Sequence, residues 1–395
     1  MLKKENFVFL LFSLVSISIG VLSVYLLSHY FSIEDFGRLQ FLLTLMGIGT
    51  IFYLSGFDII IQKQIFNKND NIVYYILKYI MPISLGVMIV VAIGISLYVE
   101  NNIDVILLAT IIVSIGLFDK SNAILNAKLL FKQLRYLELF SKILILILAG
   151  LTVFYHLSLE NYLILFVITS TIVVLMRIFY TKRYLNINSN KKDIDNKKII
   201  KEGVFTTISS SYSIMSNWSE KLVLGILDPK LLAIFAIGQL LPKVIKDNVK
   251  VILIPTLNTW ASKGFEYYIS MIKKYSLTLW LIGIIIYIVV YFLVDIVISN
   301  YFIKYNDSIV IAQLLSLPLI FKFVENVKMS SMALSKHTNI FNKINNKINT
   351  LKIILVISLI PMFEINGAIL AILIVEFTRF TLVSFEYNKL IKGER

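Results

Sequence analysis

Cysteine is absent from the sequence, histidine occurs three times, and charged residues make up only 16% of the chain. Without cysteine, the protein forms no disulfide bond and offers no thiolate to a metal ion. The histidines stand at positions 29, 156 and 337, too scattered to predict a metal-binding cluster. A Gly-x-x-x-x-Gly-Lys-Ser/Thr loop is also missing, so the sequence predicts no nucleotide hydrolysis through a P-loop.

Apolar residues, by contrast, form 58% of the chain, against about 45–50% in an ordinary soluble domain. The mean hydropathy is +0.82, which a bilayer requires and a soluble core does not. The connections between apolar segments are short, which excludes a membrane-tethered enzyme with a large globular head. Twelve apolar segments recur, at 7–28, 38–61, 76–98, 104–125, 139–157, 161–180, 204–226, 231–254, 276–298, 308–332, 351–363 and 366–385.

These segments predict helices, because only helices and closed barrels satisfy backbone hydrogen bonds in lipid. Barrel strands would alternate in polarity over about ten residues, and these segments do not. We therefore expect an all-α integral membrane protein with about twelve transmembrane helices. The run at 7–28 is too long for a signal peptide and lacks a small-x-small cleavage site, so we assign it as the first span.

The longest polar stretch, at 181–201, separates two sets of six predicted spans. Because six is an even number, both sets enter the membrane in the same orientation, as parallel repeats do. We predict an N-terminal six-helix bundle over 1–180, a cytosolic basic linker over 181–203, and a C-terminal six-helix bundle over 204–395.

The net charge of +14 is first interpreted as membrane topology rather than as a sign of nucleic-acid binding. Most lysines and arginines lie at the termini or in the connections after even-numbered segments. The connections after odd-numbered segments carry only Arg38, Lys230 and Lys304. The positive-inside rule then places both termini and the basic connections in the cytosol.

Eleven basic residues remain outside the termini and connections, and each charge costs about 2.5–3.5 kcal/mol at the bilayer centre. Lys243 and Lys246 lie one helical turn apart in the eighth span, beside Asp247. Two like charges on one buried helix face require an anion or a water-filled cavity. We therefore predict that these lysines are functional.

The tenth predicted span repeats this pattern with Lys322, Glu325 and Lys328, spaced three residues apart. Glu325 can neutralise one of the two lysines locally, which leaves one positive charge over.

Two further predicted spans carry adjacent opposite charges. The seventh contains Glu220 and Lys221 next to a serine-rich face. In the twelfth, Glu376 and Arg379 are spaced to neutralise each other, which favours a structural role.

Three short motifs carry a resemblance to a known family. Residues 27–40, at the first external turn, read Leu-Ser-His-Tyr-Phe-Ser-Ile-Glu-Asp-Phe-Gly-Arg-Leu-Gln, and residues 224–236 are their counterpart in the second half, Leu-Gly-Ile-Leu-Asp-Pro-Lys-Leu-Leu-Ala-Ile-Phe-Ala. Residues 365–371, Ile-Asn-Gly-Ala-Ile-Leu-Ala, match a Gly-x-x-Gly-Ala pattern without its first glycine. The chain resembles the polysaccharide flippases of the O-antigen (Wzx) type, in the multidrug/oligosaccharidyl-lipid/polysaccharide (MOP) exporter superfamily.

The resemblance implies two MATE-like bundles around a cavity, and no enzymatic activity. Its implied substrate is an undecaprenyl diphosphate-linked oligosaccharide for O-antigen, lipopolysaccharide or capsule synthesis, moved across the bacterial cytoplasmic (inner) membrane by alternating access. The implied partners are membrane lipids, a polysaccharide polymerase and a chain-length regulator, with H⁺ or Na⁺ coupling and no other cofactor. The expected substrate-binding residues are Lys221, Lys243, Lys246, Lys322 and Lys328, and those for ion coupling are Glu220, Asp247 and Glu325.

Three alternatives stay open. An integral-membrane polysaccharide polymerase would need a sizeable external loop to organise a catalytic site, and the sequence has none. A multidrug cation exporter would favour a carboxylate-rich cavity over lysines. An exporter of cell-wall lipid precursors is closest in chemistry and hardest to separate from our hypothesis.

Overall fold

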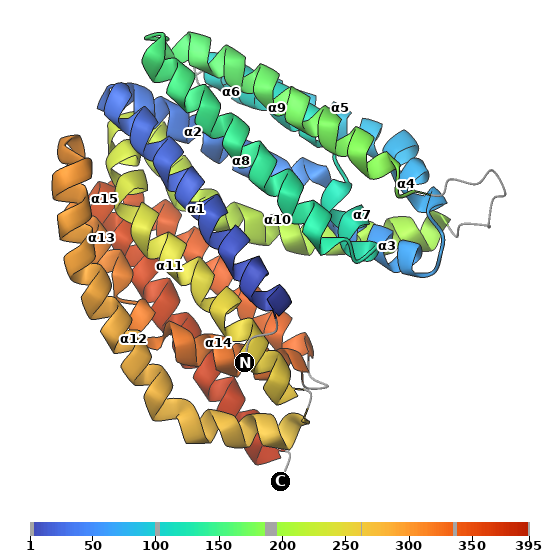
Figure 1. Ribbon diagram of the computed structural model, residues 1–395, viewed down its shortest axis with the longest axis vertical. Coiled ribbons are helices and arrows are strands. Elements are labelled where there is room, and N and C mark those ends of the chain that lie inside the picture. The colour runs from blue at the N-terminus through green and yellow to red at the C-terminus, as the bar shows by residue number, and fades with distance from the viewer. Residues whose placement is uncertain (1–3, 99–102, 186–195, 262, 335–337, 394–395) are drawn as a thin grey trace. The chain divides into compact units, whose positions relative to one another are not determined.

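The computed structural model describes residues 4–98, 103–185, 196–261, 263–334 and 338–393. All regular structure within these ranges is helical, so the expected all-α class is confirmed (Figure 1). The elements are α1 (Lys4–Tyr30), α2 (Ile33–Gly49), η1 (Thr50–Tyr53), α3 (Ser55–Phe66), α4 (Asn71–Tyr75), η2 (Ile76–Ile80), α5 (Met81–Tyr98), α6 (Ile103–Gly116), α7 (Ser121–Ala127), α8 (Phe131–Phe154), α9 (Leu159–Lys182), α10 (Asn196–Leu227), α11 (Pro229–Ala261), α12 (Phe265–Tyr301), η4 (Ile303–Tyr305), α13 (Ser308–Ser316), α14 (Leu319–Leu334) and α15 (Thr338–Gly393).

These helices account for all twelve predicted spans, because several spans are built from more than one helix. The second span is interrupted at Leu54, whose φ of 51° is left-handed, so that α2 and η1 end there and α3 begins. The tenth is interrupted between α13 and α14, beside Pro318. Conversely, α15 contains two predicted spans, and its backbone leaves the helical region at Glu364, with φ 50° and ψ −125°. This break lies where the sequence predicts the turn between the last two spans.

By length and apolar composition alone, seven described stretches are sufficient to cross a membrane. The other predicted spans are shorter, as in α6 and α7, or carry several charged residues, as in α10 and α11. The seven are Ile33–Tyr53, Asn71–Leu97, Phe131–Phe154, Leu159–Lys182, Phe265–Tyr301, Ser308–Met332 and Lys343–Gly393.

Large apolar side chains cover the outer faces of several helices. Val90 on α5, Phe179 on α9 and Leu277 on α12 are each at least two-thirds exposed. Exposed apolar surface of this extent is unfavourable in water and marks contact with another apolar phase. Together with the long apolar helices, it identifies a multi-pass membrane protein.

The chain folds into two compact units. One contains residues 18–218, and the other contains residues 219–395 together with 1–17. The boundary between them falls inside α10. The predicted division into 1–180 and 204–395 stays a prediction, and residues 186–195 of the predicted linker lie outside the described residues.

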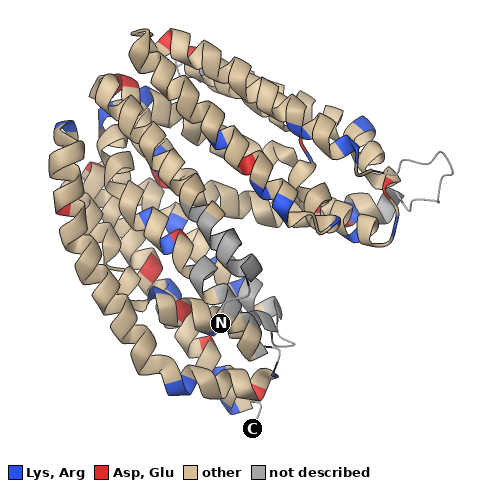
Figure 2. Ribbon diagram, viewed as in Figure 1, with Lys and Arg blue, Asp and Glu red and all other residues tan. Residues whose placement is uncertain are grey.

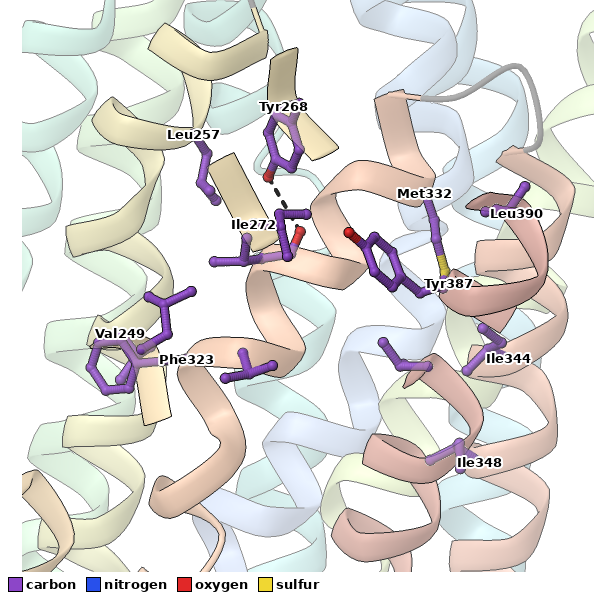
Figure 3. Packing of buried hydrophobic residues seen from close by; sticks show 14 of the residues in the cluster. Val249, Leu257, Tyr268, Ile272, Phe323, Met332, Ile344, Ile348, Tyr387 and Leu390 are labelled. Carbon is purple, nitrogen blue, oxygen red and sulfur yellow. Dashed lines mark hydrogen bonds between the residues drawn. The ribbon is translucent and has the colours of Figure 1, made fainter. Parts of the chain in front are cut away.

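A cluster of buried apolar side chains forms the core of the unit that contains α11 to α15 (Figure 3). Val249 of α11, Ile272 of α12 and Phe323 of α14 are among its buried side chains. The Tyr268 hydroxyl donates a hydrogen bond to the backbone carbonyl of Val327 over 3.2 Å, which satisfies the phenol inside this core. The apolar packing fixes α12, α14 and α15 in register and so positions the polar side chains between them.

A glycine permits α12 and α14 to approach closely within this unit. A Cβ atom added at Gly283 would lie 2.2 Å from the backbone carbonyl oxygen of Ile320. Since backbone cannot move aside as a side chain can, this contact requires glycine on α12.

Candidate functional site

Basic and acidic residues both occur along the helices that contain residues 219–395 (Figure 2). Charged side chains from three of these helices meet inside the protein. Glu376 of α15 is at the centre: its Oε1 accepts from Lys246 Nζ of α11, and its Oε2 accepts from Lys322 Nζ of α14, both at 3.0 Å. Lys322 Nζ also donates to Glu325 Oε1 over 2.7 Å. We call these four residues, together with Arg379, the Glu376 cluster.

Burial within the Glu376 cluster is uneven. The side chains of Lys322, Glu325 and Glu376 are 8%, 4% and 7% exposed, whereas that of Lys246 is 34% exposed. Lys246 is therefore the most exposed of these four residues, and its partner Glu376 is buried.

Local helix geometry explains how the cluster assembles. Lys322 and Glu325 are three residues apart on α14, which places their side chains on one face. Their apolar neighbours Phe323 and Val324 are buried in the core, and so is Val375, the residue before Glu376. Packing of these apolar groups therefore brings the charged groups of α14 and α15 together.

Within the five residues of the cluster, cations outnumber carboxylates. Lys246, Lys322 and Arg379 accompany the carboxylates of Glu325 and Glu376, and Arg379 is close enough to both carboxylates to interact electrostatically. Each buried ion loses several kcal/mol of hydration, which only well-aligned partners offset. Asp247, exposed beside Lys246, supplies the carboxylate that balances the third cation.

Two buried polar atoms of the cluster also lack a hydrogen-bond partner within the described residues. They are Glu325 Oε2 and Arg379 Nε. Buried unsatisfied atoms are uncommon in folded proteins, and each calls for an explanation such as a bound water, a bound ion or a functional role.

A second charged group lies between α10 and α15. Lys352 Nζ is 2.9 Å from Glu220 Oε2 and 3.2 Å from Glu220 Oε1, and the Glu220 side chain is buried. Lys221 and Lys243 are close enough to repel each other, so a second concentration of positive charge lies beside this pair. Lys243 itself is exposed.

Lys328 occupies different surroundings from Lys322, although both belong to α14. Its Nζ donates to Ser384 Oγ over 3.0 Å and lies 5.6 Å from the ring centroids of both Phe380 and Tyr387. A cation held over two aromatic faces by a hydroxyl is stabilised without a carboxylate.

The structure thus brings together three of the expected site residues, Lys246, Lys322 and Glu325, and places Lys221 near Lys243. Asp247 is exposed and close enough to Lys246 to interact electrostatically. Lys328 makes its own separate contacts. The roles expected for all eight residues stay predictions.

Sequence reasoning assigned no functional role to Glu376, and Lys352 was not expected to contribute to the site. The sequence offered a pairing of Glu376 with Arg379 at a spacing of three, whereas the carboxylate also binds Lys246 and Lys322 from other helices. The available signal was a carboxylate in one predicted apolar span and lysines in other spans. The sequence does not specify which of those lysines the carboxylate contacts.

The charges inside residues 18–218 are arranged in pairs. Lys120 Nζ is 2.9 Å from Asp58 Oδ1 and also donates to the carbonyl oxygen of Tyr53, at the break before α3. Arg177 lies 3.2 Å from Asp119. These pairs neutralise the buried charges, and Lys120 also satisfies a carbonyl group at the broken helix.

No group of three histidine, aspartate or glutamate side chains that could hold a metal ion occurs among the described residues. Lysines and Arg379 outnumber the carboxylates where the Glu376 cluster meets Lys221, Lys243 and Lys352. Lysine ammonium groups bind phosphate as point charges, without the planar geometry of arginine.

Comparison with known proteins gives both a family and a fold. A family model described as a polysaccharide biosynthesis protein matches residues 26–263. No curated protein matches the sequence.

Solved structures of transporters match nearly the whole chain. They include the lipid II flippase MurJ in an inward closed conformation, with 17% identity, a TM-score of 0.71, and coverage of 96% of this chain and 87% of that chain. An inward-facing MATE family transporter of the MOP superfamily has 12% identity, a TM-score of 0.66, and coverage of 97% and 100%. A MOP superfamily transporter from Pyrococcus furiosus has 11% identity, a TM-score of 0.59, and coverage of 96% and 94%.

Proposed function

The chain belongs to the polysaccharide biosynthesis protein family, and from this membership we propose that it is a flippase for polyprenyl diphosphate-linked oligosaccharides. Its fold is that of transporters of the MOP superfamily, so the expected resemblance is confirmed at the level of family and fold. The finer proposal is that the cargo is an O-antigen or capsule repeat unit carried on undecaprenyl diphosphate.

The observation that carries this proposal is the excess of positive charge in the Glu376 cluster and the charged group beside it. Together they contain six cations and four carboxylates, namely Lys221, Lys243, Lys246, Lys322, Lys352 and Arg379 against Glu220, Asp247, Glu325 and Glu376. Lys246 and Lys322 are held inside an apolar helical unit, where isolated cations are unfavourable. A diphosphate supplies multiple negative charges to such a site, and lysine is suited to bind it. A cationic drug would instead be repelled by the excess positive charge.

The proposed site combines the cluster with the neighbouring lysines. In this proposal Lys221, Lys243, Lys246, Lys322 and Lys328 bind the diphosphate and the first sugars during translocation. The carboxylates of Glu220, Asp247 and Glu325 exchange H⁺ or Na⁺ to drive the cycle. The lipid tail stays in the bilayer while alternating access exposes the site first to the cytosol and then outward.

The setting of this transport is also a proposal. We place the protein in the bacterial cytoplasmic (inner) membrane with both termini in the cytosol, as the distribution of basic connections predicts. A polysaccharide polymerase and a chain-length regulator would receive the exported repeat unit.

A second candidate is an exporter of cell-wall lipid precursors. It is favoured by one specific observation, the TM-score of 0.71 with the lipid II flippase MurJ. Lipid II-type precursors also carry a diphosphate, so the same lysines would serve either cargo. The two candidates differ in the glycan, and the effect of depletion separates them.

Depletion of the protein tests the proposal in cells. We expect unpolymerised lipid-linked repeat units to accumulate on the cytosolic leaflet while cell-wall synthesis continues. Accumulation of unpolymerised units on the outer leaflet would assign the protein to a later step. A block in cell-wall synthesis, with normal surface polysaccharide, would favour the second candidate.

A further inference from the structure

Glu376 occupies the position that an anionic ligand of the cluster would take. Its two carboxylate oxygens each accept from a different lysine, Lys246 Nζ and Lys322 Nζ, at 3.0 Å. A bridging phosphate presents oxygens to two ammonium groups in the same way. The chain therefore supplies its own anion to a pair of lysines on two different helices.

The two lysines differ in how firmly Glu376 holds them. Lys322 has a second carboxylate partner, Glu325 Oε1 at 2.7 Å, and is almost fully buried. Lys246 is one-third exposed, and within the cluster Glu376 is the carboxylate at ion-pair distance from it. An entering anion would meet Lys246 first, and Glu376 could release it while keeping Lys322.

We propose that Glu376 is a built-in substitute for the substrate's diphosphate: it binds Lys246 between transport cycles and is displaced from Lys246 when the diphosphate arrives. This proposal rests on the proposed function and adds Glu376 as a residue that sets affinity. The exchange conserves the pairing of Lys246, because one anion replaces another. Glu376 remains neutralised by Lys322 and by nearby Arg379.

Binding of Glu376 to Lys246 lowers the energetic cost of the empty site. Without an internal anion, the empty site would carry unpaired buried cations during its return across the membrane. With Glu376 in place, the substrate must compete for Lys246, so its apparent affinity is its intrinsic affinity multiplied by the fraction of time that Lys246 is unoccupied. Weaker binding also permits release on the far side.

The test uses purified full-length protein in detergent micelles and inorganic pyrophosphate as the probe. We expect Glu376→Gln to bind pyrophosphate about tenfold more tightly than the unaltered protein, by isothermal titration calorimetry, because the competing charge is removed. Adding Lys246→Gln to this variant should abolish the gain. Glu386→Gln, on the same helix about 15 Å further along, is the matched control and should change nothing.

A charge-balanced variant guards against loss of folding. Glu376→Gln combined with Arg379→Gln removes one charge of each sign, keeps Lys322, and still leaves Lys246 without its partner. It should also bind pyrophosphate more tightly than the unaltered protein. Affinity in both variants that equals or falls below that of the unaltered protein, with a cooperative melting transition retained, overturns the proposal.

The same preparation distinguishes the source of the phosphate. We expect a polyprenyl diphosphate to displace pyrophosphate from Glu376→Gln at a lower concentration than phosphatidylglycerol does. The reverse order would assign the site to bulk lipid and contradict the proposal. If depleted cells export repeat units normally while Glu376→Gln still binds pyrophosphate more tightly, the flippase function fails and the exchange of anions at Glu376 stands.

Discussion

Lys246 on α11 donates to Glu376 on α15 over 3.0 Å, although 130 residues separate them in the sequence. The pair ties together two helices that begin more than a hundred residues apart, and it does so with charges rather than apolar contacts. The functional proposals depend on this relationship, because it converts scattered lysines into one anion-binding centre.

The ion pair between Lys322 and Glu325 should contribute more to stability than an exposed pair of similar spacing. In a double-mutant cycle with Lys322→Met and Glu325→Gln, we expect a coupling free energy of about 1–3 kcal/mol, because both groups are buried. The exposed pair Arg38–Glu34 is the control and should give about 0–1 kcal/mol. Chemical unfolding in detergent measures both cycles, and equal couplings would contradict the burial of the Glu376 cluster.

Gly283→Ala should destabilise the unit that contains α12 and α14. The added Cβ would lie 2.2 Å from the carbonyl oxygen of Ile320, so the helices must separate, at a cost of about 1–3 kcal/mol. Gly86→Ala on α5 is the matched control, since no atom lies within 4 Å of its added Cβ. Thermal unfolding should show a clear decrease only for Gly283→Ala, and equal effects would disprove the close approach.

Lys246→Gln should impair transport without loss of the protein from the membrane. Losing one charged contact to phosphate is expected to slow translocation about tenfold or more. Lys389→Gln, an exposed site near the end of α15, is the control and should transport normally. Surface polysaccharide measured at matched protein levels is the readout, and normal surface polysaccharide in Lys246→Gln would remove this lysine from the mechanism.

Cysteine labelling tests the predicted orientation directly, because the natural chain has no cysteine to remove. A cysteine at position 307, just before α13, should react with a membrane-impermeant maleimide in intact cells. A cysteine at position 392, near the end of α15, should react only after permeabilisation. Labelling in the opposite pattern would invert the topology that the positive-inside rule predicts.

Much of the fold follows from local sequence, because lipid requires long apolar helices whatever their neighbours. The break at Glu364 coincides with the predicted turn between the last two spans, and the α13–α14 junction lies beside Pro318. The break at Leu54 was not predicted, since leucine itself gives no turn signal and the left-handed residue is stabilised by its surroundings.

The site was predictable only where its contacts are local. The pairing of Lys322 with Glu325 follows from their spacing of three on one helix. The partner of Lys246 does not, because the packing of α11 against α14 and α15 decides which carboxylate it meets. The sequence favoured a structural role for Glu376 for the same reason: pairing with Arg379 on its own helix was the only contact that spacing could indicate.

The central claim is that this protein moves a diphosphate-linked glycan across a bilayer, and a reconstituted assay tests it most directly. The purified protein is placed in liposomes with a fluorescent polyprenyl diphosphate oligosaccharide in both leaflets, and an impermeant reductant then bleaches the outer leaflet. We expect bleaching of nearly all the fluorescence with the unaltered protein, and of about half with Lys246→Gln when bleaching is faster than its residual flipping. Bleaching of only half the fluorescence with the unaltered protein would contradict the account.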